Sequence, residues 1–373
     1  MLRRSHKKSR GGCVQCKQRH VKCDERRPTC LLCSMSNRDC SFASEANASP
    51  QTSSPATPAE TSHPSSSENV PEEINLKHME LLIHLTTTNE MFNLGDDIGP
   101  YPTGIAFALK RGLHSPYLLY ASLAFSARHL AYLDIERSAE FMHQAVTLQT
   151  RALALFNVDQ IQVDKSNCVA ILLFSAVVGH HLLADTLMER GYNGLPGFLA
   201  RYVHCARTHR GLYSIMMTAK PLLMETELEP VLSRSINFTS QEPKGTHCQT
   251  FRDRIIRTYS TTEEREACLR AMKYVQLGFD ALSYSYEHHS MRYQMLFLWS
   301  VLVPPEYIDM LTAKQPFALV VLAYYALLLH HGRHMWQVGE AGAYLFGMIE
   351  GYLGSPFVDW LQYPRIGIRG SWH

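Results

Sequence analysis

Residues 12–40 read GCVQCKQRHVKCDERRPTCLLCSMSNRDC and contain six cysteines in a regular order. The spacing is C-x2-C-x6-C, then six further residues, then C-x2-C-x6-C again. A C-x2-C pair can present both sulfurs to one ion, and a third cysteine six residues later can close onto the same ion. The repeat therefore predicts a metal cluster whose ligands are Cys13, Cys16, Cys23, Cys30, Cys33 and Cys40.

The number of thiols indicates the kind of cluster. Two separate four-coordinate zinc sites need eight thiolates, so six are enough only if the two ions share two sulfurs. We therefore expect a binuclear cluster with two zinc ions per chain. The alternative is a disulfide framework, which requires an oxidising compartment. The first residues, MLRRSHKKSRGG, have no apolar core of the kind found in a secretory signal, so the metal cluster is favoured.

Basic residues are concentrated around the cysteines. Residues 1–40 contain 11 Lys and Arg residues against three acidic ones, a formal charge of +8, whereas the other 333 residues carry −6. A small, strongly basic module on a mildly acidic body is typical of a nucleic-acid-binding protein. The run RRSHKKSR at residues 3–10 also resembles a nuclear localisation signal, so we expect the protein in the nucleus.

The cysteine array resembles the fungal Zn2Cys6 binuclear cluster family of transcription regulators, and all six cysteines match that family's motif. The resemblance implies that Cys13 and Cys30 bridge the two ions. It further implies that one zinc site is completed by Cys16 and Cys23, and the other by Cys33 and Cys40.

The same resemblance implies a DNA-reading element. In the family, the stretch between the second and third cysteines is a short helix that enters the major groove and contacts a CGG triplet. Arg and Lys suit guanine because its O6 and N7 atoms both accept hydrogen bonds on the groove edge. Carried over by position, the DNA-binding residues are Lys17, Arg19, His20 and Lys22, with His20 standing where the family often has Lys or Arg.

The chain divides by composition into four parts. A basic arm (1–12) precedes the cysteine module (13–42), which has too few large apolar side chains to build a core, so metal binding should supply its folding free energy. Residues 43–71 hold eight Ser, three Thr and five Pro, and we expect a disordered linker there. Residues 72–373 form a regulatory or effector domain of about 300 residues, ample for a large core.

The large domain reads as all-helical, so the fold class is mainly α. Strand signals are sparse, residues 237–250 look like a loop, and Ser115-Pro116 marks a helix start. The most apolar runs, 168–178 and 318–329, are shorter than the ~18–20 residues of a spanning helix, which favours core helices and no membrane partner. Helical patterns are predicted at 76–94, 116–133, 136–156, 166–188, 196–217, 263–284, 290–302, 316–332 and 341–353.

This domain also resembles the all-helical effector domain of fungal regulators like the sterol uptake control proteins. The matching stretches include HMELLIHL (78–85), SLAFSARHLA (122–131) and PFALVVLAYYALLL (316–329). In that family the domain mediates self-association, and in some members it binds a sterol. The stretch MWQVGEAG (335–342) keeps Trp336 and Gly339 of the family's aromatic loop and lacks its other aromatic residues. The resemblance implies that Trp336 and Gly339 are ligand-binding residues for a small apolar molecule.

Three functional readings follow. The first is a sequence-specific, zinc-dependent DNA-binding regulator of RNA polymerase II transcription. In this interpretation it binds CGG-like half-sites as a homodimer and contacts the transcription machinery. Its targets would be the genes of a fungal biosynthetic gene cluster. The second adds a ligand sensor in the helical domain. The third is an enzyme or transporter accessory with an incidental zinc module. The basic residues inside the array disfavour the third, and no P-loop, G-x-G-x-x-G, H-E-x-x-H or G-x-S-x-G motif points to an enzyme.

Overall fold

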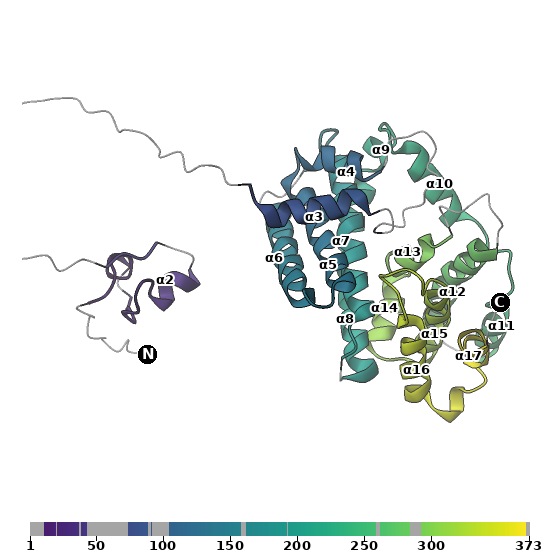
Figure 1. Ribbon diagram of the computed structural model, residues 1–373. Helices are drawn as coiled ribbons and strands as arrows, with labels where there is room; N and C mark the ends of the chain where they lie inside the picture. The colour runs from purple at the N-terminus through teal and green to yellow at the C-terminus, as the bar shows by residue number, and fades with distance from the viewer. Residues whose placement is uncertain are drawn as a thin grey trace, which may run out of the picture. The chain divides into compact units, whose positions relative to one another are not determined.

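The computed structural model describes residues 11–19, 21–36, 39–42, 74–88, 91, 104–157, 162–191, 193–258, 262–283 and 292–370 (Figure 1). These residues fall into two compact units, one within Met1–Glu72 and one within Glu73–His373. The basic run at 3–10 and the expected linker at 43–71 lie outside the described residues. Every regular element among the described residues is a helix, which confirms the mainly-α fold class.

The first unit is a small module with two short helices, α1 (Val14–Gln18) and α2 (Leu31–Met35). Its buried side chains are cysteines, with Cys40 and Phe42 packed against them. Large apolar residues such as Leu31 and Met35 are 50% and 77% exposed. An apolar core therefore contributes little to this unit.

The second unit begins with a layer of helices around α5 (Pro116–Leu133), which packs against α6 (Ser138–Asn157) and α7 (Cys168–Met188). In Figure 1 the helix α3 (Leu76–Thr87) lies across α5 and α6, and α4 (Ile105–Gly112) lies beside it. Phe156 stacks on Phe174 at 4.6 Å between ring centres, and Tyr117 packs edge-on against both rings in the interior of this layer.

The long helix α8 (Gly194–Thr218) packs against α7 and connects this layer to a second one. The centre of the second layer is α15 (Pro316–His331), in which every residue from Ala318 to Leu329 is buried. Around it lie α11 (Gln249–Thr258), α12 (Thr262–Ser283), α13 (Gln294–Leu302), α14 (Pro305–Thr312), α16 (Ala341–Leu353), a 3-10 turn at Ser355–Phe357 and α17 (Gln362–Arg369). The short α9 (Lys220–Leu223) packs against α7 and α8, and α10 (Glu229–Ser240) follows it in the chain.

Three buried aromatic side chains of this layer donate hydrogen bonds to backbone carbonyls. Trp299 stacks on Tyr325 at 4.1 Å between ring centres, and its Nε1–H donates to the Ala271 carbonyl at 3.0 Å. The Tyr325 hydroxyl donates to the Leu296 carbonyl at 2.5 Å, and that of Tyr307 to the Ala318 carbonyl at 2.9 Å. Apolar burial of this kind is the dominant stabilising contribution in a domain of this size.

Most predicted helices match the structure closely, and Pro116 occupies the first turn of α5 as expected. Two expectations were wrong in detail. The helix predicted at 76–94 ends at Thr87, where Thr86 and Thr87 turn their hydroxyls onto backbone carbonyls of the same helix. The loop predicted at 237–250 is shorter, because α10 continues to Ser240 and α11 begins at Gln249.

The helix α7 is long and apolar enough to span a membrane by length and composition, with a mean hydropathy of 1.8 over 18 residues. Within the fold 72% of that window is buried, by α5 and α8 among others. The bent pair α14 and α15, at 106° to each other, passes the same test and is also packed inside the domain. The two most apolar helices, α7 and α15, therefore belong to the core, as the sequence indicates.

Candidate metal centre and nucleic-acid interface

The two halves of the cysteine module have the same local structure. Cys13 is the residue before α1, and its sulfur accepts a hydrogen bond from the Cys16 N–H at 3.4 Å. Cys30 occupies the same place before α2, and its sulfur accepts from the Cys33 N–H at 3.4 Å. A sulfur at the N-cap satisfies a helix N–H that would otherwise lack a partner.

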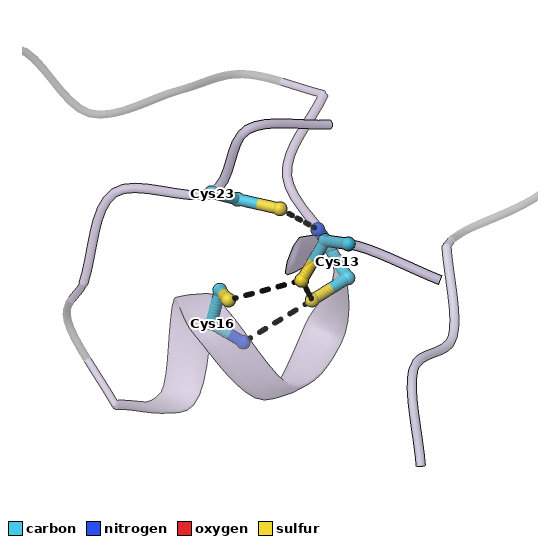
Figure 2. A group of neighbouring side chains, drawn as sticks. Cys13, Cys16 and Cys23 are labelled. Carbon is cyan, nitrogen blue, oxygen red and sulfur yellow. Dashed lines mark hydrogen bonds between the residues drawn. The ribbon is translucent and has the colours of Figure 1, made fainter. Parts of the chain in front are cut away.

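The third cysteine of each half returns to the first. The Cys13 N–H donates to the sulfur of Cys23 at 3.5 Å, and the Cys30 N–H donates to that of Cys40 at 3.2 Å. Figure 2 shows the side chains of Cys13, Cys16 and Cys23 converging in the first half. The sequence repeat is therefore a structural repeat, and in each half the three sulfurs lie close together.

Two overlapping groups of four sulfurs result. One consists of Cys13, Cys16, Cys23 and Cys30, and the other of Cys13, Cys30, Cys33 and Cys40; within each, all sulfurs lie within 4.8 Å of one another. The members common to both groups are Cys13 and Cys30. All six cysteines are free thiols, so the described residues of the module contain no disulfide.

The spacing of the sulfurs fits tetrahedral zinc. Zinc–thiolate bonds of about 2.3 Å at tetrahedral angles place neighbouring sulfurs about 3.8 Å apart. The Cys13 sulfur lies 3.7 Å from those of Cys30 and Cys33, and the Cys16 sulfur lies 3.7 Å from that of Cys30. The donor set, four sulfurs to a group with two in common, suits two zinc ions.

The surroundings favour the thiolate at the two common positions. Burial raises the pKa of the Cys16 and Cys33 thiols, that of Cys33 to about 12. Burial acts in the same direction at Cys13 and Cys30, but the hydrogen bonds from the Cys16 and Cys33 N–H groups, together with those from neighbouring cysteine side chains, outweigh it and lower both pKa values, that of Cys13 to about 6. Thiolate is the form that binds zinc, so these two sulfurs are the better prepared ligands.

Contacts outside the cysteines close the module. The Gln15 side chain donates to the Ser41 hydroxyl at 3.0 Å and accepts from the Ser41 N–H at 2.9 Å. The Arg27 guanidinium lies 5.0 Å from the centre of the Phe42 ring. Sequence reasoning missed this closure, because a Gln and a Ser 26 positions apart carry no recognisable spacing.

The basic residues lie on the outside of the module. Lys17 is in α1, Arg19 is its C-cap and Lys22 follows; all three side chains are exposed and form no ion pair with a described residue. His20 lies outside the described residues. Exposed, unpaired cations beside a compact module are available to an acidic polymer.

The helix implied between Cys16 and Cys23 differs from the observed one. It begins at Val14 and ends at Gln18, and the Val21 N–H then donates to the Cys16 carbonyl at 3.1 Å, a bond that closes a helix end. The chain has to leave the helix at this point because Cys23 must reach back to Cys13. Of the expected DNA contacts, Lys17 is therefore helical and Lys22 lies outside any regular element.

The expected ligand residues of the body lie apart from any described cavity. Trp336 is 7% exposed, stacks on His129 at 4.6 Å between ring centres, and donates through Nε1–H to the Met91 carbonyl at 3.2 Å. The Gln337 side chain donates to the same carbonyl at 2.9 Å. Gly339 has a positive φ of 46° in the turn that follows. These contacts tie the turn at 332–340 to the first helical layer.

Comparison with known proteins agrees with this geometry. Residues 11–49 match the fungal Zn(2)-Cys(6) binuclear cluster domain. The chain is 51% identical over 43 residues to Sterol uptake control protein 2 of Candida albicans, which is 12% of this chain and 6% of that protein. It is 54% identical over 41 residues to a Zn(2)-C6 fungal-type transcription factor of Gibberella zeae, 11% of this chain and 8% of that protein.

A longer match includes part of the helical body. The chain is 28% identical over 189 residues to a Zn(2)-C6 fungal-type transcription factor of Aspergillus fumigatus, which is 43% of this chain and 48% of that protein. The chain thus spans less than half the length of these curated relatives. No solved structure matches it significantly. Residues 11–49 are therefore a fungal Zn(2)-Cys(6) binuclear cluster domain with two zinc ions as its cofactor.

Proposed function

We propose that this protein is a zinc-dependent, DNA-binding transcription regulator that acts in the nucleus. One observation carries the proposal: two four-sulfur groups share Cys13 and Cys30, in a module matched by the binuclear cluster domain of fungal transcription factors. In this proposal Cys13 and Cys30 bridge the ions, and the other four cysteines complete the two sites. Zinc orders a module whose apolar side chains are too exposed to fold it alone.

The DNA-reading surface is proposed to include Lys17, Arg19, His20 and Lys22, with CGG-like triplets as the target. Arginine and lysine match the paired acceptors of guanine in the major groove. The exposed side chains of Lys17, Arg19 and Lys22 and the formal charge of +8 over residues 1–40 support this role. Phosphate contacts supply affinity and base contacts supply specificity.

Binding of the full chain to a CGG duplex and to a scrambled duplex tests this function. We expect a preference for CGG and a logarithmic affinity that falls with logarithmic salt by about 0.9 per phosphate contact. Lys17→Ala or Arg19→Ala should weaken binding, whereas Lys110→Ala, which removes the same charge from exposed surface of α4, is the matched control. Equal affinity for the two duplexes would contradict sequence-specific recognition.

The body is proposed to hold two chains together on paired half-sites and to contact the transcription machinery. A single three-base-pair site is too short for genomic specificity, and a linked second module raises the effective concentration at the second half-site. Leu76, Met79 and Ile83 share one face of α3 and are 77%, 39% and 62% exposed, which supports self-association there.

Sedimentation of the full chain should give a dimer, and Ile83→Glu should shift the equilibrium toward the monomer. A wild-type chain that stays monomeric on paired half-sites would contradict the proposed dimer.

A further inference from the structure

A cavity of about 150 Å³ lies beneath α10. Its walls come from α7, α8, α9, α10 and α13, and about half of the lining residues are aliphatic, for example Leu172, Leu232 and Leu298. It is separate from the turn at 332–340, because no residue of that turn lines it. An apolar cavity of this volume accommodates a molecule the size of one six-membered ring. Larger apolar ligands such as sterols need the several hundred Å³ of ordinary ligand pockets.

One wall of the cavity carries the side-chain amide of Gln294. Gln294, the first residue of α13, donates through Nε2 to the Ser235 hydroxyl of α10 at 2.5 Å. Its Oε1 is buried and accepts no hydrogen bond from any described residue. Because Oε1 has almost no accessible surface, a molecule in the cavity cannot reach it, and the amide serves to hold α10 against α13.

A second polar group lines the same cavity. His209 of α8 is 7% exposed and forms no hydrogen bond with a described residue. Burial lowers the pKa of His209 to about 4, so the ring is neutral near pH 7 and offers one donor and one acceptor.

The fold makes room for that ring at a specific position. Gly179 lies in the middle of α7, where a Cβ atom would come within 2.3 Å of His209 Nε2. Glycine inside a helix is unfavourable relative to alanine, so its presence here is explained by the imidazole that it admits. The ring at the cavity wall is therefore built into the packing of two long helices.

From this arrangement we propose that the cavity is a binding site for a compact, single-ring molecule bearing one hydroxyl group, such as a phenol. The hydroxyl hydrogen-bonds with His209, and the ring fills the aliphatic part of the cavity. The helix α10 forms the cover: none of its residues is fully buried, and Ser235 joins it to Gln294. A role of the ligand in controlling transcription depends on the function proposed above. The binding site itself depends only on the structure of the helical body.

Titration calorimetry of the full chain with phenol and with benzene tests the site. We expect phenol to bind about tenfold more tightly than benzene, the ratio that one net hydrogen bond supplies. His209→Phe, which keeps a ring but removes both nitrogens, should remove most of that preference and leave benzene binding in place. No measurable binding of phenol to the wild-type chain, or equal affinity for both molecules, would overturn the proposal.

Variants that fill the cavity test the binding site independently. Ala176→Leu places a larger side chain in the cavity from α7 and should abolish binding of both molecules, and Leu232→Phe should do the same from α10. Ala139→Leu, at an exposed position of α6, is the control and should bind as wild type does. Thermal unfolding establishes which variants fold, and a folded cavity-filling variant that still binds phenol would contradict the site. DNA binding measured in parallel separates the proposals, because loss of phenol binding alone leaves the regulator function intact.

Discussion

The two units of this chain are stabilised in different ways. In the first, the buried residues are cysteines, and Leu31 and Met35 lie exposed. In the second, the core is aliphatic and aromatic, with α15 buried along its entire middle. A module of about 30 residues cannot bury enough apolar surface to fold, so ligand bonds to metal replace a core, whereas about 300 residues can. Loss of zinc and loss of apolar packing should therefore each affect one unit and spare the other.

Removal of zinc should have the largest effect. Structural zinc contributes on the order of 10–16 kcal/mol in small cysteine-rich modules at pH 7, so chelation should unfold residues 11–42 and abolish DNA binding. Far-UV circular dichroism of the full chain should change little, because the longest helices lie in the body. A large loss of helical signal on chelation would show that the body depends on the metal.

A cavity in the body core should give the converse result. Trp299 is fully buried, stacks on Tyr325 and donates to the Ala271 carbonyl. Trp299→Ala should lower the free energy of unfolding by about 3–5 kcal/mol. Chemical denaturation followed by circular dichroism measures this, and the zinc content of the folded protein should equal that of wild type.

Acid should destabilise the body before its carboxylates titrate. Burial lowers the pKa of His181 to about 4, with Asp185 opposing and Arg128 adding to the shift, and burial lowers that of His209 to about 4. The unfolded chain binds protons at these histidines near pH 6.5, so stability is lost as the pH falls from about 6.5 toward 4.

Each of these histidines should contribute roughly 1.4 kcal/mol per pH unit in that range. The melting temperature of the body, followed at 222 nm between pH 7 and pH 5, measures the effect. His209→Gln should flatten the profile. An unchanged melting temperature across this range in the wild-type chain would show that the buried rings do not gain protons on unfolding.

Single side chains on the surface of the module should have the smallest effects. Arg19→Ala should weaken DNA binding by about 1–3 kcal/mol and relax preference at one base pair if Arg19 contacts a base. Arg26→Ala, at an exposed residue that pairs with Asp24, is the comparison for a contact with phosphate, which should weaken all duplexes alike. Competition assays with duplexes changed at one base pair distinguish the two outcomes.

Sequence reasoning succeeded where a pattern is local and repeated. The spacing of the cysteines predicted a two-zinc cluster, and the length of the apolar stretches predicted helices such as α5 and α15 almost to the residue. It failed where structure depends on distant contacts. Short amphipathic helices such as α10 and α11 gave too few periodic residues, and α1 ends early because Cys23 must return to Cys13. The cavity beneath α10 joins residues from 172 to 302, a relation that no spacing reveals.

The central claim is that Cys13 and Cys30 are shared by two zinc ions, and native mass spectrometry of the full chain tests it most directly. The wild-type chain should carry two zinc ions. Cys13→Ala or Cys30→Ala should lose both, since each serves both ions, whereas Cys40→Ala should retain one. One ion in the wild-type chain, or one retained after loss of Cys13, would contradict the shared-sulfur arrangement.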